Sequence, residues 1–141
     1  MKRNSLGTLS LVVFSLLRTS GAHAQSMEEA NVPFTFQVGT AQLPAGHYVI
    51  KEDHIRESIK ISNVDTGAVV FAYVGQSSAD AVKGALVFRN VGAQHFLAEV
   101  CGSEDSLNLT LPVSKMEKQA RALQVASTHT QDPQRVLVAL K

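Results

Sequence analysis

Apolar and polar residues alternate along several short segments of the chain, which is the pattern of strands that lay one face on a core. The first such segment has Val32, Phe34, Phe36 and Val38 on one side, with Pro33 and polar residues between them. We expect it to form one strand that begins at a sheet edge, because proline has no N–H to donate to a neighbouring strand.

Turn-forming residues separate a series of further strands. Pro and Gly within 43–46, and Asp, Thr and Gly within 64–67, are typical of chain reversals. The run from Ala68 to Val74 is the most apolar of the series, so we interpret it as a central strand covered on both faces. The expected strands span 47–52, 59–61, 68–74, 85–91 and 94–101, and the apolar segment 136–140 adds a last one.

A single helix is expected near the end of the chain. Ser114 and Glu117 have the spacing of a capping box, in which each side chain binds a free N–H of the first turn. Met116, Ala120 and Leu123 follow at helical spacing as an apolar stripe, and the helix spans about 114–125. Several strands with one late helix predict an all-β fold: an antiparallel β-sandwich as first choice and a small β-barrel as second, with one short C-terminal helix.

Residues 1–24 have the composition of a secretory signal peptide. Lys2 and Arg3 precede an apolar run that ends at Arg18, and Ala22 and Ala24 place small residues at both recognition positions for signal peptidase. The run is shorter than the roughly 20 apolar residues that cross a bilayer. We therefore expect an exported protein, periplasmic or extracellular, in which residues 25–141 form a single β domain without a stable transmembrane segment.

Composition and charge narrow the classes of function. With 45% apolar and 18% charged residues, the chain fits one globular domain. Outside the signal segment, ten basic residues stand against twelve acidic ones, so no overall positive charge favours binding to nucleic acid. Cys101 is the single cysteine and cannot form an internal disulfide, which leaves a buried thiol and an intermolecular bridge as alternatives.

One short motif is associated with catalysis. Residues 65–68, Asp-Thr-Gly-Ala, resemble the motif of retroviral-type aspartic proteases, in which two small chains pair their aspartates. Those enzymes have an apolar strand before the motif, whereas Ser62 and Asn63 precede it here. The same residues are ordinary in hairpin turns, and we favour the turn. A dimeric aspartic protease that uses Asp65 is the catalytic alternative.

Three histidines are the candidate metal ligands. They are His47, His54 and His95. None of them has the close spacing to another ligand that zinc motifs require. We interpret them as polar residues on exposed strand faces, and we expect no metal site and no cofactor.

Five segments together resemble a group of small, functionally uncharacterised exported bacterial proteins. The segments are 32–36 (VPFTF), 43–48 (LPAGHY), 86–88 (LVF), 96–100 (FLAEV) and 111–115 (LPVSK). The resemblance implies export and an all-β fold, and it supplies no catalytic residue. The chain departs from the pattern at Thr35, where the group often has Asp.

These observations favour an exported, non-catalytic protein that binds a partner protein or another component of the cell envelope. An exposed sheet edge, through strand addition, and the polar loop from Gly75 to Gly84 are the surfaces expected to bind. A small barrel that carries an apolar ligand is a third hypothesis.

Overall fold

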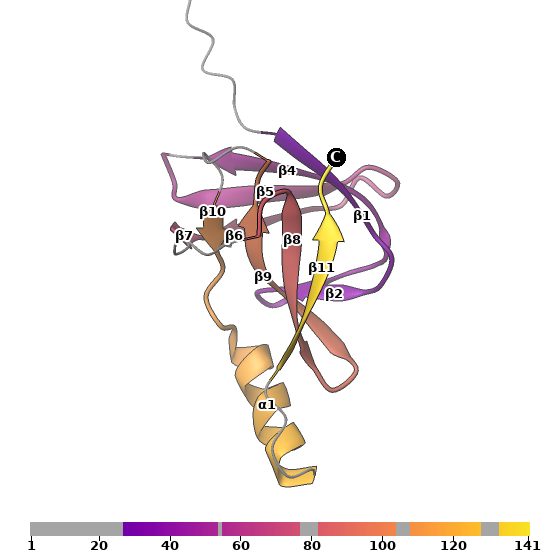
Figure 1. Ribbon diagram of the computed structural model, residues 1–141, viewed down its shortest axis with the longest axis vertical. Helices are drawn as coiled ribbons and strands as arrows, with labels where there is room; N and C mark the ends of the chain where they lie inside the picture. The colour runs from indigo at the N-terminus through magenta and orange to yellow at the C-terminus, as the bar shows by residue number, and fades with distance from the viewer. Residues whose placement is uncertain (1–26, 54, 77–81, 104–107, 128–132) are drawn as a thin grey trace, which may run out of the picture.

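The computed structural model describes residues 27–53, 55–76, 82–103, 108–127 and 133–141, which form strands and one helix (Figure 1). The predicted signal segment and His54 lie outside the described residues. In chain order the elements are β1 (Met27–Val32), β2 (Phe36–Val38), β3 (Ala41–Leu43), β4 (Gly46–Asp53), β5 (Ser58–Asn63), β6 (Val69–Tyr73), β7 (Gly75–Gln76), β8 (Ala85–Val91), β9 (Gln94–Cys101), β10 (Asn108–Thr110), α1 (Lys115–Ser127) and β11 (Gln134–Ala139). Among the described residues, no helix is both long and apolar enough to cross a membrane.

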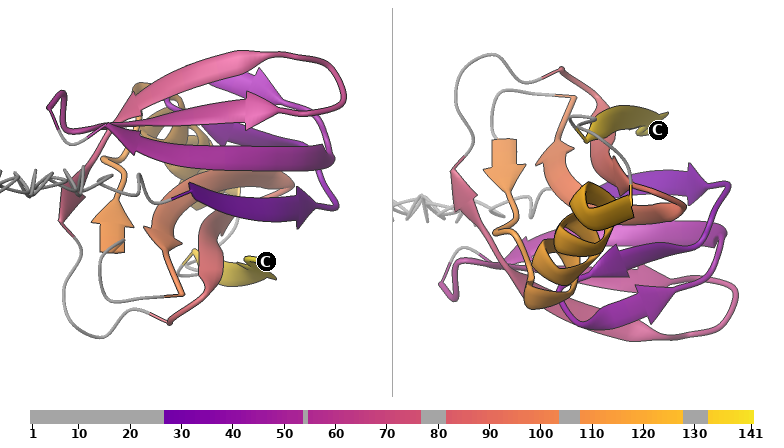
Figure 2. Two further views of the ribbon diagram at one scale, coloured as in Figure 1. Left: turned by 90° about the horizontal axis from the view of Figure 1, so that it is seen from above. Right: turned by 90° about the horizontal axis from the view of Figure 1, so that it is seen from below.

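The strands form two sheets that pack as layers (Figure 2). The smaller sheet is antiparallel and has the order β1-β4-β5-β6. The larger sheet has the order β11-β8-β9-β10-β7, with β2 parallel to β9 and β3 paired to β2, and it curls into a half-barrel. The predicted all-β class with one helix is confirmed, and the architecture is a sandwich whose larger layer is curled.

The two sheets meet where β1 lies beside the end of β11. Ala30 forms an isolated antiparallel bridge with Leu140, and the Lys141 amide donates a hydrogen bond of 2.9 Å to the Glu29 carbonyl. Ala30 is fully buried at this junction. The end of the larger sheet therefore covers the margin of the smaller sheet at Glu29 and Ala30.

Aromatic rings from both layers pack in the core. The Phe36 ring meets Tyr48 and Phe88 edge to face, with ring centroids 5.1 and 5.3 Å apart. The hydroxyl of the buried Tyr48 donates a hydrogen bond to the Pro44 carbonyl, which provides the partner that a buried hydroxyl needs. Burial is also the main reason why the pKa of Tyr48 is raised. The turn sequence 43–48 thus ends in a residue that fastens the turn to the core.

The prediction of one strand from Val32 to Val38 is wrong in its boundaries. β1 begins earlier, at Met27, and ends at Val32, and β2 begins at Phe36. The chain leaves the smaller sheet at Pro33, which has a fixed φ and no N–H for a ladder, and joins the larger sheet. Val32 and Phe36 are nevertheless both buried, because the two strands face one core from opposite sides.

The interpretation of 68–74 as a central strand is also wrong. β6 lies along the outer margin of the smaller sheet, where it pairs with β5 (Figure 2). Val69, Phe71 and Tyr73 are 45, 61 and 78% exposed, whereas Val70 and Ala72 are partly buried. One face of β6 thus lies against the core and the other is in solvent.

The predicted helix is present as α1, but its predicted apolar stripe is wrong. Met116 is 37% exposed and Leu123 is 72% exposed, and Glu117 is the buried residue of the helix. Figure 1 shows that α1 projects from one end of the layered body, so most of its circumference faces solvent. Ala120 and Leu123 face the β8–β9 hairpin at residues 91–94, but only across a pocket, so the hairpin does not cover the stripe.

Candidate functional site

Asp65 lies in the turn between β5 and β6 and has a structural role there. Its carboxylate accepts a hydrogen bond of 3.0 Å from the His47 amide at the start of β4. The Asn63 side-chain oxygen accepts the Asp65 and Thr66 amides at 2.9 and 2.8 Å, and Gly67 has a φ of 73°, which side chains with a Cβ rarely adopt. The predicted hairpin turn is confirmed, and the Asp-Thr-Gly sequence is what builds it.

The two candidate metal ligands that the structure describes lie in different sheets. His47 is on β4, where its Nε2 atom is 3.4 Å from a Glu29 carboxylate oxygen. His95 is on β9, where its ring stacks on Phe34 with centroids 4.1 Å apart and bonds the Asn90 side chain. Within the described ranges, no three His, Cys, Asp or Glu side chains cluster as a metal site would require.

Cys101 is fully buried at the end of β9. Burial raises the pKa of its thiol, and the Glu99 carboxylate, with an oxygen 4.0 Å from the sulfur, raises it further. A buried thiol with a raised pKa is a poor nucleophile and is poorly placed for an intermolecular bridge.

The predicted binding loop from Gly75 to Gly84 is described only in part, because residues 77–81 lie outside the described ranges. Its first two residues form β7, which pairs with β10 in the larger sheet. Gly75 and Gln76 line a pocket of about 320 Å³ together with Glu52 and Glu57.

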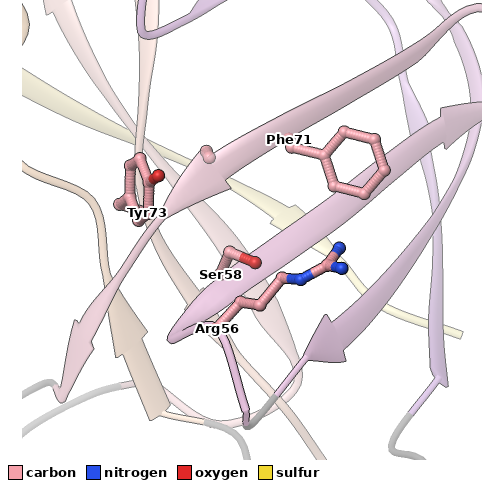
Figure 3. Close-up of a pocket in the computed structure, with 5 residues that line it drawn as sticks. Arg56, Ser58, Phe71 and Tyr73 are labelled. Carbon is pink, nitrogen blue, oxygen red and sulfur yellow. The ribbon is translucent and has the colours of Figure 1, made fainter.

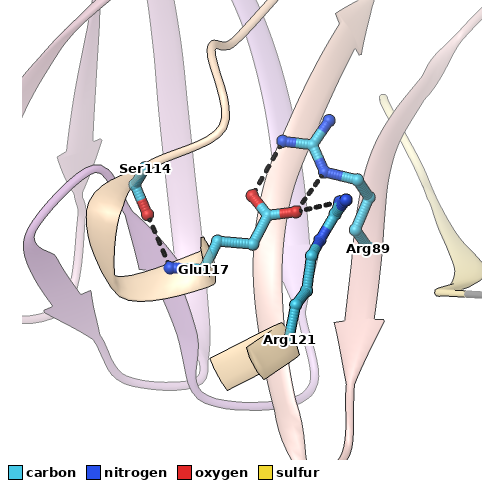
Figure 4. Close-up of polar contacts among 4 residues, drawn as sticks. All are labelled: Arg89, Ser114, Glu117 and Arg121. Carbon is cyan, nitrogen blue, oxygen red and sulfur yellow. Dashed lines mark hydrogen bonds and ion pairs between the residues drawn. The ribbon is translucent and has the colours of Figure 1, made fainter. Parts of the chain in front are cut away.

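A cluster of charges around the buried Glu117 joins α1 to β8 (Figure 4). Arg89 donates to both carboxylate oxygens of Glu117, at 2.7 and 3.0 Å, and Arg121 contacts the same carboxylate. Ser114 accepts the Glu117 amide at 3.1 Å, so half of the predicted capping box is present. The carboxylate does not complete the box because the two arginines bind it instead. This cluster holds the helix against β8, and because one carboxylate is shared by two guanidinium groups, it keeps one net positive charge.

Among the described residues, the outer edge of β6 has backbone groups without a hydrogen-bond partner. Two flanking bonds fix the direction of its peptide groups: the Asn63 amide donates to Ala68 at 2.8 Å, and the Val74 amide donates to Glu57 at 3.0 Å. Since peptide groups in a strand alternate in direction, Val70 and Ala72 face β5, and Val69, Phe71 and Tyr73 face the open edge. The residues with exposed side chains are thus also those with free N–H and C=O groups.

The other margins in the described part of the chain are short, partly covered or charged. β3 has three residues and β7 has two, whereas β11 pairs only with β8, contacts β1 only near Leu140 and has a charge at Arg135. β6 has five residues, Val-Val-Phe-Ala-Tyr, with neither a charge nor a proline. Natural proteins usually place such features on edge strands to prevent pairing with another chain, so their absence from β6 marks this edge as open to a partner.

A pocket lies beside this edge on the outer face of the smaller sheet (Figure 3). It encloses about 440 Å³ and is lined by Arg56, Ser58, Phe71, Ala72 and Tyr73. The rings of Phe71 and Tyr73 are on β6. Arg56 is in the β4–β5 turn, and its guanidinium lies over the outer face of the sheet, between β4 and the two rings. Arg56 Nε is 3.8 Å from an Asp53 oxygen, an exposed and weak ion pair that leaves the guanidinium accessible. We call Val69, Phe71, Tyr73 and the open backbone edge beside them the β6 surface.

Sequence reasoning assigned Phe71 and Tyr73 to the core and so missed the β6 surface. The signal that identifies it is in the partner strand: Ser58, Lys60 and Ser62 alternate with two isoleucines, so β5 has one polar face. A strand joined to β5 by a tight hairpin has the same solvent-facing side.

Comparison with known proteins identified no relative: no protein-family model, curated protein or solved structure matches the chain.

Proposed function

We propose that the protein is an exported, non-catalytic binding protein that holds an extended segment of a partner polypeptide at the β6 surface. The partner segment adds as a further strand beside β6, so that its backbone completes the hydrogen bonds that the edge leaves free. Phe71 and Tyr73 then contact its side chains. A single observation carries the proposal. The apolar strand β6, with two aromatic residues among its five, lies at an open sheet edge with both aromatic side chains exposed to solvent.

Burial energetics support a partner at this position. Phe71 and Tyr73 are 61 and 78% exposed, and apolar area removed from water contributes roughly 25 cal/mol per Å². Aromatic side chains also have few rotatable bonds, so ordering them at an interface has a small entropic cost. Backbone pairing and two ring contacts together provide both affinity and register.

The proposal is distinct from the hypothesis of an apolar ligand inside a barrel. The space between the layers is occupied by side chains, among them Phe36, Tyr48 and Phe88, which are at most 2% exposed. The β6 surface lies outside this core and needs no internal cavity.

The test uses a displayed library of random peptides as the probe, selected on residues 25–141. Val69→Pro removes one outward N–H from the edge without removing a bond to β5, and Val69→Ala is the matched control that keeps the N–H. We expect selected peptides to lose at least about tenfold in affinity for Val69→Pro and little for Val69→Ala, with circular dichroism verifying the fold of both.

A second measurement needs no variant. On adding a selected peptide, the amides of Val69, Phe71 and Tyr73 should become protected from hydrogen exchange. Selected peptides that leave these amides unprotected, or a selection that yields no peptide, would overturn the proposal.

A further inference from the structure

Two lysines lie directly opposite each other on the outer face of the smaller sheet. Lys51 on β4 is the register partner of Lys60 on β5, and Lys60 is in turn the register partner of Phe71 on β6. Both ammonium groups are on exposed residues. Lys51, Lys60 and Phe71 therefore form one row across the three neighbouring strands β4, β5 and β6. We call Lys51 and Lys60 the lysine pair.

The lysine pair costs stability in the free protein. Like charges directly opposite each other on neighbouring strands repel. Among the residues that the structure describes, neither ammonium has a carboxylate within 4.0 Å. The acids on the same face are held elsewhere: Glu29 by His47, and Asp53 by Arg56 and by the Ile55 amide. An unfavourable local arrangement that no internal contact compensates is typical of a functional surface.

The outer face of the smaller sheet therefore has positively charged side chains next to the two aromatic rings. Lys51, Lys60 and Arg56 lie behind Phe71 and Tyr73 as seen from the open edge, although the chain as a whole has almost no net charge. A strand added to β6 lies two strand spacings from β5, about 10 Å. A lysine has a long flexible stem, so the Lys60 ammonium can reach toward the edge past its register partner Phe71, and a long acidic side chain on the added strand can reach back toward it.

We infer that the partner segment is acidic, with carboxylate side chains on the face that it shares with Phe71 and the lysine pair. This inference rests on the proposed function, since it names the chemistry of the strand that β6 accepts. Carboxylates from the partner neutralise the two ammonium groups and remove their repulsion, so the interaction that is unfavourable in the free protein becomes favourable in the complex. Apolar residues at the same face of the partner contact the rings.

The experiment compares two synthetic peptides of equal length, in which valine alternates with glutamate in one and with glutamine in the other. Each is titrated into the wild-type protein, the Lys51→Gln/Lys60→Gln variant and the Lys115→Gln/Lys118→Gln variant. The last is a matched control, because it removes two exposed lysines from α1, which is remote from β6.

We expect the wild-type protein to bind the glutamate peptide about tenfold more tightly than the glutamine peptide at low ionic strength, and added salt to reduce this preference. The preference should vanish in the Lys51→Gln/Lys60→Gln variant and persist in the α1 control. The affinity for the glutamine peptide should be the same in all three proteins.

Other outcomes overturn the inference in distinguishable ways. If both peptides bind equally and Val69→Pro weakens both, the charge inference is wrong and the proposed function stands. If neither binds and library selection also fails, the proposed function is wrong. Binding to phosphatidylglycerol vesicles without binding to the peptides would assign the lysine pair to a membrane surface. Self-association that Val69→Pro abolishes, again without peptide binding, would assign the edge to a second copy of the chain.

Discussion

The two edge strands of the smaller sheet, β1 and β6, differ in whether another part of the fold packs beside them. Along β1, Ala30 and Val32 are fully buried and the end of β11 lies against the strand. Along β6, Phe71 and Tyr73 are mostly exposed, and no described strand lies beyond. The strands also differ in composition, since β1 (MEEANV) has two glutamates and an asparagine and β6 (VVFAY) has no polar residue other than Tyr73. The difference between the margins therefore comes both from the residues of each strand and from what the chain places next to it.

The comparison shows which margin is available to a partner. A covered edge contributes to the stability of the domain, whereas an uncovered edge contributes little and leaves its backbone groups free to pair. The features that natural proteins use to protect an edge are missing from β6 and present only one strand inward, at Lys60. An unprotected edge of this kind is what the proposed binding role requires.

Hydrogen exchange should show the largest contrast, within β6 itself. The amides of Val70 and Ala72 face β5, and those of Val69, Phe71 and Tyr73 face the open edge. We expect the first group to exchange at least about a hundredfold more slowly than the second. NMR exchange rates on the free protein measure this, and equal protection of both groups would mean that another segment covers the edge.

Removal of two methyl groups at each margin should give unequal losses of stability. Val32→Ala on β1 creates a cavity at a fully buried site and should lower the free energy of unfolding by about 2 kcal/mol. Val69→Ala on β6 removes a side chain that is 45% exposed and should cost roughly 0.5 kcal/mol or less. Urea denaturation measures both values, and similar losses at the two sites would contradict the comparison.

The turn that leads into β6 gives a smaller effect. Asp65→Ala removes the acceptor of the His47 amide and should cost about 1 kcal/mol. Asp65→Asn keeps an acceptor oxygen at the same position and should be close to wild type in stability. Thermal unfolding of the pair tests this structural role. A proteolytic activity in the wild-type protein that Asp65→Asn abolishes would instead support the protease hypothesis.

The smallest expected effect has the opposite sign. Lys60→Glu replaces a like-charge neighbour of Lys51 by an opposite charge, so it should stabilise the free protein by roughly 0.5 kcal/mol. Lys118→Glu on the exposed side of α1 provides a control for the change in net charge. A gain in the melting temperature for Lys60→Glu alone is the expected result, and a loss would show that the lysine pair is not unfavourable.

The sequence correctly predicted which side chains of a strand are buried where one face of that strand packs on the core. Tyr48 and Ile50 on β4, and Ile59 and Ile61 on β5, are all buried as their alternation indicates. The hairpin turns at 64–67 and 92–93 and the late helix were also predictable, because turn residues and a capping serine act locally. Three strands that the sequence did not predict, β3, β7 and β10, have two or three residues each and are too short to produce a periodic signal.

Two errors have a common physical cause. The apolar run at 68–74 and the stripe of Met116 and Leu123 both predict burial only if another part of the fold packs against them. No described layer lies opposite the outward face of 68–74, and the stripe on α1 faces only the β8–β9 hairpin, across a pocket. At α1 the helix is anchored instead by the charges of Glu117, Arg89 and Arg121, and no spacing rule within the helix indicates a partner on β8.

By itself, the sequence determined the all-β class, most strand faces, the turns and the position of the helix, because these depend on residues close together in the chain. Tertiary structure alone decided which sheet margin is closed, that Glu117 is buried, and that Lys51, Lys60 and Phe71 stand in one row. Those features depend on the register between strands and on contacts between distant segments. Alternation within a strand sets which way a side chain points, but only the pairing of strands sets what stands beside it.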